Sequence, residues 1–150
     1  MNAIGASIPR AGGRLWSRLV SQPEILPKGF GELIGVEWLS FDPEDARARI
    51  KIEDHHLQPF GVVHGGVYCS LAESICSAAA YNAVREDDMV AMGQSNDTTF
   101  LRSIPEGHVN ATARTRHRGR TTWIFDVEMT DDEGRVCALA RIVIAIRPKR

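Results

Sequence analysis

One stretch, residues 58–80, limits most strongly what this chain can fold into. Its sequence, QPFGVVHGGVYCSLAESICSAAA, predicts a tight turn followed by a helix from about Gly65 to Val84. Almost every position of that helix is apolar or small, so it has hardly any polar face. A helix of this kind is usually buried on all sides. We therefore expect the rest of the chain to wrap around it.

Two features of this helix are unusual for a buried segment. Glu73 places a carboxylate in its middle, which is unfavourable in a core unless the group is paired or its pKa rises. The helix also opens with His64-Gly65-Gly66, which offers no Ser, Thr, Asp or Asn to cap the first N–H groups. A glycine-opened, uncapped helix with one internal carboxylate indicates a candidate reaction site.

The remaining segments predict antiparallel strands. Two apolar or alternating stretches precede the helix and form an expected hairpin, at 34–41 and 46–53. Four more follow it, near 90–102, 109–118, 123–130 and 136–147. The expected class is α+β, an antiparallel sheet of five to six strands wrapped around one long helix. We expect one domain at 29–150, preceded by a lead-in at 1–28 with a short amphipathic helix near 13–21.

Composition excludes several classes of function. The chain has 150 residues and a net charge of -1, so no global charge attracts nucleic acid or a membrane. It has no apolar run of about 18 residues and no signal-peptide core. An odd count of three cysteines then indicates a reduced, cytoplasmic protein. His55, His56 and His64 lack a carboxylate or cysteine at ligand spacing, so we expect no metal site.

Glu73 shares one stripe of the helix with small or polar residues. Gly66, Ser70 and Ser77 lie at i-7, i-3 and i+4 from it. A carboxylate on such a stripe can act as a base or a nucleophile. The alternative is a carboxylate paired with an arginine across a subunit interface. The helical pattern alone does not choose between the two.

The glycines at the helix start have two explanations as well. Free N–H groups at a helix N-terminus bind anions, and without a Cβ at Gly65 or Gly66 a ligand can approach the backbone closely. An oxyanion that develops during a reaction is a suitable guest. The alternative is steric, since glycines let a helix start against a crowded strand. Gln58, in the preceding loop, either holds a water or a carbonyl or is an ordinary surface residue.

Basic residues gather in the second half of the chain. Most often such a set is the solvated face of a strand, and the alternative is a clamp for the phosphates of a nucleotide-bearing ligand. The set comprises Arg102, Arg114, Arg116, Arg118, Arg120, Arg147, Lys149 and Arg150.

Two motifs, QPFGVVHGGVYCSLAES and VAMGQSNDTTFLRSIPEGHV, resemble those of the hotdog-fold acyl-CoA thioesterases. The similarity is greatest to the branch of the Arthrobacter-type 4-hydroxybenzoyl-CoA thioesterase and the phenylacetate-pathway thioesterases, and it covers about residues 30–150. It implies a hotdog fold and hydrolysis of an acyl-CoA with an aromatic acyl group. It also implies no cofactor beyond the CoA of the substrate, and a homo-oligomer, a dimer of dimers, whose site is shared between neighbouring subunits.

The resemblance assigns roles to four residues of the helix and the loop before it. The Gly65 N–H would hold the thioester carbonyl, helped by the helix dipole. Glu73 would be the nucleophile or the general base. Gln58 would orient the thioester, and Ser77 would support the attacking group at a position where the relatives have threonine.

The resemblance also implies contacts with the rest of the substrate. His64 is among them, and the pantetheine arm would lie along the strand from Val90 to Gly93. The CoA phosphates would meet Arg102, Arg120, Thr121 and Arg150, although relatives have a small hydroxyl residue in place of Arg120. Asp97 stands where a relative has histidine, so the acyl group can differ.

Two other functions fit a hotdog domain. One is a non-catalytic module that binds acyl-CoA as a sensor or carrier, against which the presence of Glu73 argues. The other is a hydratase or dehydratase, but its Asp-x-x-x-x-His pattern at the helix opening does not occur in this sequence.

Overall fold

The computed structural model describes residues 29–149, and these follow the predicted order of two strands, a helix and four strands. The elements are α1 (Phe30–Leu33), β1 (Val36–Ser40), β2 (Ala46–Lys51), η2 (Asp54–His56), α2 (Gly65–Val84), η3 (Arg85–Asp87), β3 (Met89–Phe100), β4 (His108–Arg118), β5 (Thr122–Thr130) and β6 (Val136–Pro148). The lead-in at 1–28, its expected helix and Arg150 lie outside the described residues. No helix within 29–149 is both long and apolar enough to cross a membrane.

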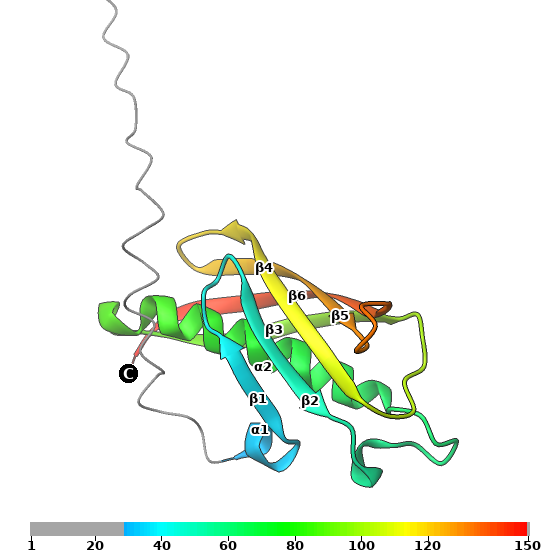
Figure 1. The fold of residues 1–150 in the computed structure, drawn as a ribbon. Helices are drawn as coiled ribbons and strands as arrows, with labels where there is room; N and C mark the ends of the chain where they lie inside the picture. The colour runs from blue at the N-terminus through cyan, green and yellow to red at the C-terminus, as the bar shows by residue number, and fades with distance from the viewer. Residues whose placement is uncertain (1–28, 150) are drawn as a thin grey trace, which may run out of the picture.

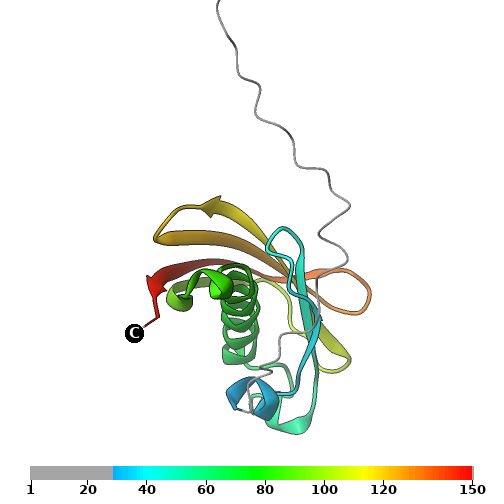
Figure 2. The same ribbon diagram turned by 90° about the vertical axis from the view of Figure 1, so that its left-hand side faces the viewer.

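The six strands form one antiparallel sheet in the order β1-β2-β4-β5-β6-β3. This sheet curls around α2, which crosses its concave side in Figure 1 and is seen nearly along its axis in Figure 2. The chain therefore has the hotdog fold, as the sequence predicts. Since β3 pairs only with β6 in the described chain, its other edge is left open.

The core forms where the inward faces of the strands meet α2. The predicted alternation of β5 is confirmed, because Trp123, Phe125, Val127 and Met129 are all buried. Small residues on the facing side of the helix, such as Ala72 and Ala79, have no exposed surface and let the sheet approach closely. Burying one large apolar side chain in such a core stabilises the fold by about 1.5–3 kcal/mol.

One expectation about α2 is wrong: the helix is not buried on all sides. Leu71, Ile75 and Cys76 face the core, but Glu73 and Gly66 are exposed and Ser70 and Ser77 are half-buried. The sheet curves around only part of the helix, and β3, the last strand on that side, has no neighbour beyond it. The polar stripe around Glu73 therefore faces outward in the single chain.

The turn between β5 and β6 is held by a buried carboxylate. Asp131 accepts hydrogen bonds from the backbone N–H groups of Glu133 at 3.0 Å and Arg135 at 2.9 Å, and from the Arg135 guanidinium at 2.6 Å. Burial by itself raises the pKa of Asp131, but the hydrogen bonds from Arg135 and Glu133 outweigh it and hold the pKa below its usual value. The ionised form is therefore the one that stabilises the turn.

We expect Asp131→Asn to lower the melting temperature at neutral pH. A carboxyl group with a depressed pKa in the folded state contributes stability above its unfolded pKa of about 3.9, and this contribution is lost as the pH falls through the folded value. The difference in melting temperature between the wild type and the variant should therefore narrow below about pH 4. Thermal melts over a pH series measure it, with Glu128→Gln on the exposed face of β5 as the control. A gap that is constant with pH would contradict the prediction.

Candidate functional site

The start of α2 is capped, contrary to the prediction from its sequence. His64 is the N-cap residue, and its Nδ1 accepts the Gly66 N–H at 2.9 Å. The N–H of Val67 bonds to the His64 carbonyl, also at 2.9 Å. Within the described residues, the Gly65 N–H alone among these first three has no hydrogen-bond partner. The histidine cap therefore leaves one free donor, at the position expected to bind an oxyanion.

The tautomer of His64 follows from the same bond. A nitrogen that accepts a backbone N–H carries no proton, so the neutral His64 ring has its proton on Nε2. The ring is exposed, so this second N–H can donate to a ligand beside Gly65. Sequence reasoning placed His64 at the substrate but missed its role as a cap, because histidine is not among the preferred N-cap residues.

Phe100, at the end of β3, covers Gly65. A methyl group on Gly65 would lie 2.9 Å from Cζ of the Phe100 ring, which is closer than ordinary contact. This contact supports the steric explanation for the glycine, and its ligand-binding role stays a prediction. The Phe100 ring is half exposed and lies 5.9 Å, centroid to centroid, from the buried ring of Tyr68. The space beside the free donor is therefore bordered by an aromatic wall.

Glu73 lies against β3 at a second glycine. A methyl group on Gly93 would lie 2.9 Å from Cδ of Glu73, so only a glycine leaves room for the carboxylate here. No ion pair joins Glu73 to a basic side chain within residues 29–149. The carboxylate is exposed and available to a ligand.

α2 and β3 run antiparallel across this contact. Gly65 lies beside Phe100, and Glu73 lies beside Gly93. Between them, the Asn96 side chain donates to the Cys69 carbonyl at 2.9 Å. Sequence reasoning missed both Phe100 and Asn96. Asparagine is depleted in strands, so its presence in β3 was a usable signal, whereas the contact of Phe100 depends on how the helix packs.

Gly65 and Glu73 do not converge on one point within a single chain. They are eight residues apart on the same helix, which is about 12 Å along its axis, and Ser77 is one turn further. A glutamate side chain does not span two helical turns. A reacting group that touches both the free N–H and the carboxylate must therefore take them from two different chains.

Gln58 lies in the loop that leads to α2. Its backbone closes a turn, since its N–H bonds to the Val62 carbonyl and its carbonyl accepts the Gly61 N–H, each at 2.9 Å. The side chain is half-buried and makes no hydrogen bond within the described residues. Phe60, at the tip of the loop, is 86% exposed.

The residues predicted to contact CoA phosphates lie at opposite ends of β3. Arg102 follows Phe100, whereas Thr121 accepts the Ile146 N–H at 3.0 Å, beside the Met89 end. β3 has 12 residues and is therefore roughly 36 Å long, so Arg102 and Arg120 cannot meet in one chain.

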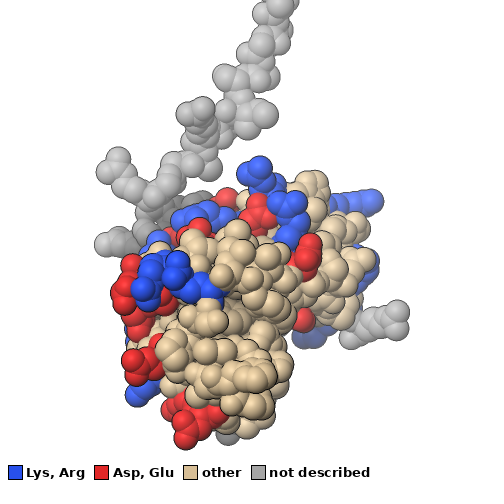
Figure 3. All heavy atoms as spheres, turned by 90° about the vertical axis from the view of Figure 1, so that its right-hand side faces the viewer, with Lys and Arg blue, Asp and Glu red and all other residues tan. Residues whose placement is uncertain are grey.

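Several other arginines are engaged on the solvated strand face, as the simpler explanation of the basic set predicts. Arg114 pairs with Asp45 at 3.7 Å, and Arg116 pairs with Asp126 at 3.6 Å. Arg118 does not lie on this face: after a bulge in β4 it pairs with the buried Trp123, with its guanidinium carbon 4.3 Å from the ring centroid. Figure 3 shows basic and acidic side chains intermingled over one face of the molecule, around a broad uncharged area.

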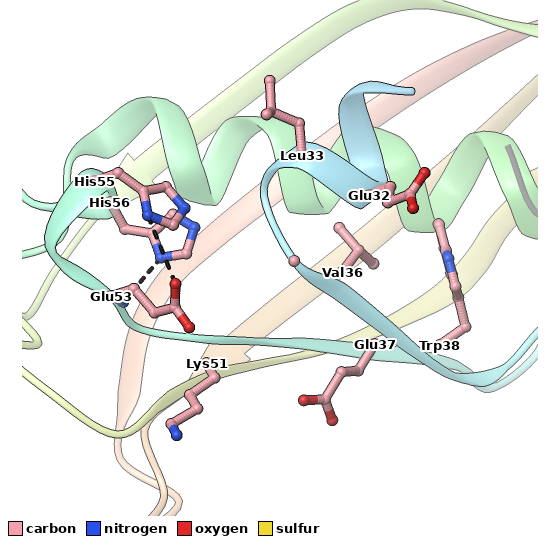
Figure 4. Close-up of a pocket in the computed structure, with 10 residues that line it drawn as sticks. Glu32, Leu33, Val36, Glu37, Trp38, Lys51, Glu53, His55 and His56 are labelled. Carbon is pink, nitrogen blue, oxygen red and sulfur yellow. Dashed lines mark hydrogen bonds and ion pairs between the residues drawn. The ribbon is translucent and has the colours of Figure 1, made fainter. Parts of the chain in front are cut away.

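A hollow of about 670 Å³ is lined by α1, β1, η2 and the end of β2 and contains none of the predicted site residues (Figure 4). Another, of about 460 Å³, lies between the end of α2 and the β4–β5 turn and includes Arg118, Arg120 and Asp87. Arg120 is thus beside a hollow that could receive part of a ligand.

Nothing within residues 29–149 groups three or more His, Cys, Asp or Glu side chains around a position for a metal ion. Burial raises the pKa of the Cys76 thiol well above its usual value, with a smaller contribution from Glu73. Cys76 is therefore an unreactive core thiol, while Cys69 is half-buried.

The chain is similar to known proteins in sequence and in fold. The model of the thioesterase superfamily known as 4HBT matches residues 60–138. PA1618 of Pseudomonas aeruginosa is 36% identical over 118 residues, which are 79% of this chain and 81% of that protein. A crystal structure of a mutant of PA1618, named a thioesterase, superposes with a TM-score of 0.77 at 34% identity over 81% of this chain and 87% of that one.

A further relative has a named substrate. The 1,4-dihydroxy-2-naphthoyl-CoA hydrolase of Listeria monocytogenes is 33% identical over 122 residues, which are 81% of this chain and 98% of that protein. The resemblance seen in the sequence is confirmed at the level of the superfamily, and these relatives do not single out the Arthrobacter-type branch.

We expect Gly93→Ala to displace the Glu73 carboxylate from β3. The glutamate can rotate into solvent, so the loss in the free energy of unfolding should stay below about 1 kcal/mol. A crystal structure of the variant measures the displacement, and denaturant unfolding measures the stability. Gly29→Ala, with no atom near its added methyl group, is the matched control. An undisplaced carboxylate beside Ala at this position would contradict the geometry.

Proposed function

This chain belongs to the thioesterase superfamily and hydrolyses acyl-CoA thioesters, and we propose that its substrate is an aromatic acyl-CoA. In this proposal Glu73 either attacks the thioester itself or activates the water that attacks it. The observation that carries the proposal concerns two groups on the open stripe of the same helix. Within residues 29–149, the Gly65 N–H is a free donor and the Glu73 carboxylate is unpaired. The first would bind the oxyanion, and the second would supply the attack.

The proposed site is formed by two chains. The open edge of β3 is a long row of unpaired backbone groups, which is a template for pairing with another strand. Antiparallel pairing of two β3 edges about a two-fold axis near Asn96 would bring Phe100 and Gly65 of the partner subunit toward Gly93 and Glu73. It would unite the two groups that one helix holds about 12 Å apart. A dimer of dimers is the assembly that we propose.

The same pairing explains the separated CoA residues. With the axis near Asn96, Arg102 of the partner subunit would lie beside Val90, at the end of β3 where Arg120 and Thr121 are found. The pantetheine arm would follow β3 from Val90 to Gly93 toward Glu73. The hollow at Arg118 and Arg120 would then receive the phosphate end of CoA.

Two chemical routes fit this site. In the first, a Glu73 oxygen attacks the thioester carbon, the C–S bond breaks to release CoA thiolate, and water hydrolyses the resulting anhydride. In the second, Glu73 removes a proton from water as that water attacks. In both, the carbonyl oxygen becomes negative and the Gly65 N–H and the His64 Nε2–H can donate to it. Gln58 would orient the thioester, and Ser77 would support the attacking group.

An aromatic acyl group is supported by the wall beside Gly65. Phe100 presents a half-exposed ring there, and Phe60 is the exposed tip of the loop that carries Gln58. Aromatic rings pack favourably against one another, by about 0.5–1.5 kcal/mol beyond the area they bury. The substrate named for one relative, 1,4-dihydroxy-2-naphthoyl-CoA, has an aromatic acyl group as well. Hydroxybenzoyl and phenylacetyl groups, typical of the Arthrobacter-type and phenylacetate-pathway enzymes, are the first candidates.

We expect Glu73→Gln to lower kcat for CoA release from benzoyl-type and phenylacetyl-type thioesters by roughly 100- to 10,000-fold, because the amide neither attacks nor takes a proton. Glu86→Gln, an exposed glutamate on η3, is the matched control. Undiminished turnover in Glu73→Gln would contradict the mechanism. Saturable binding by the wild type without turnover of any thioester would favour the non-catalytic module. Single turnover in ¹⁸O water separates the routes, since label in Glu73 indicates the anhydride.

We expect Arg102→Ala to raise KM for acyl-CoA roughly tenfold, because a charged hydrogen bond to phosphate is lost. KM for the same acyl group on N-acetylcysteamine, which has no phosphates, should not change. Arg114→Ala, which removes a surface partner of Asp45, is the control and should alter neither value. An equal effect of Arg102→Ala on both substrates would show that Arg102 does not bind the phosphates.

A further inference from the structure

The loop between β2 and α2 carries Gln58 and leads directly into Gly65, and it is closed by backbone bonds. The His64 N–H bonds to the His56 carbonyl at 2.9 Å, and Leu57 and Val63 form an isolated antiparallel bridge. The Val63 N–H in turn bonds to the Ile104 carbonyl at 2.9 Å. The direction of the Gly65 N–H therefore depends on what holds this loop in place.

His56 is a buried polar side chain near the start of the loop, with 3% of its surface exposed. Its Nδ1 accepts the Glu53 N–H at 3.0 Å, and these two residues lie next to each other in Figure 4. Its Nε2 lies 3.1 Å from the Ile34 carbonyl, between α1 and β1. Since Nδ1 accepts, it carries no proton, and Nε2 must carry the proton that the carbonyl accepts. Only the neutral Nε2–H tautomer satisfies both partners.

A continuous series of bonds thus connects the β1 side of the molecule to the helix start. The Ile34 carbonyl holds the His56 ring, the His56 carbonyl holds the His64 N–H, and His64 caps α2 one residue before Gly65. We propose that His56 is a positioning residue for thioester hydrolysis, whose neutral ring anchors the loop and thereby aims the Gly65 N–H and Gln58 at the substrate. This inference rests on the proposed function, in which Gly65 is the oxyanion donor.

The surroundings of His56 make this anchor sensitive to acid. Burial lowers the pKa of His56, as does the charge of neighbouring His55, while the bond to Ile34 and the charge of Glu53 oppose this. His55 lies close, with ring centroids 3.9 Å apart. The other titratable groups around the same hollow are Glu32, Glu37 and Lys51.

Protonation would place a second N–H on Nδ1, facing the Glu53 N–H, and the bond would be lost. A histidine with a lowered pKa in the folded state favours folding above its unfolded value of about 6.5, and this stability is lost as the pH falls toward the folded value. The anchor should therefore loosen as the pH falls through the folded pKa of His56, which lies below about 6.5, in the loop and at Gly65 together.

Kinetics of three variants test the proposal. His56→Phe keeps a ring but loses both bonds, and kcat for the aromatic acyl-CoA should fall roughly tenfold with KM within about twofold, because an oxyanion donor acts mainly in the transition state. His56→Asn, which can retain the acceptor for Glu53, and His56→Gln, which can retain the donor to Ile34, should each recover part of kcat. His55→Gln is the matched control on the exposed neighbour and should leave kcat unchanged.

The outcomes separate this inference from the proposed function. The proposed function stands if the wild type hydrolyses the thioester and Glu73→Gln does not. If His56→Phe then has a lowered melting temperature but an unchanged kcat per folded molecule, the role of His56 is purely structural and the inference is overturned. If Glu73→Gln is as active as the wild type, the proposed function fails.

An NMR titration decides the inference independently of activity and of whether the Phe variant folds. In a His55→Gln/His64→Asn background, which keeps a good cap and removes both neighbouring histidines, the amide signals of Gly65 and Gln58 should shift with the midpoint of the His56 ring, below pH 6.5. His56→Gln in that background should abolish the shift. Amide signals that do not follow the His56 ring would overturn the proposal.

Discussion

The antiparallel contact between α2 and β3 is the interaction on which the site depends. It is made at three levels, with Gly65 under Phe100, Asn96 bonded to the Cys69 carbonyl, and Gly93 under Glu73. Each of the two glycines lacks a Cβ, and a side chain from the opposite element occupies the space that a Cβ would take. The same packing that places the helix on the sheet therefore also fixes where an aromatic ring and a carboxylate stand.

This contact also leaves the residues of the proposed site on an open surface of the chain. β3 holds the helix on one edge of the sheet and leaves its own outer edge unpaired, so the polar stripe of α2 faces outward. A helix rises about 1.5 Å per residue, so a donor at its first turn and a carboxylate two turns later cannot surround one carbon atom. If both groups act on one thioester, as proposed, the geometry of the regular helix requires a second chain.

Local patterns were sufficient to predict the fold, and they failed where packing decides. The strand alternation at Trp123, Phe125 and Val127 and the bounds of α2 could be read directly, because periodicity follows from burial. The exposure of Glu73 could not, since it depends on which part of the helix the sheet leaves uncovered. The cap by His64 was missed because residue preferences at helix starts are averages, and here a histidine nitrogen takes the place of the usual side-chain oxygen.

The two histidines beside the helix start act in the same way, which no sequence pattern reveals. In both, Nδ1 accepts a backbone N–H, from Glu53 in His56 and from Gly66 in His64, and in both the proton is left on Nε2. One of these Nε2–H groups is buried against a carbonyl and the other faces solvent beside Gly65. The buried ring is thus suited to hold the loop, and the exposed ring is suited to meet the substrate. Only the neutral form of the buried ring satisfies both of its partners, so the positioning role proposed for His56 favours neutral over acidic conditions.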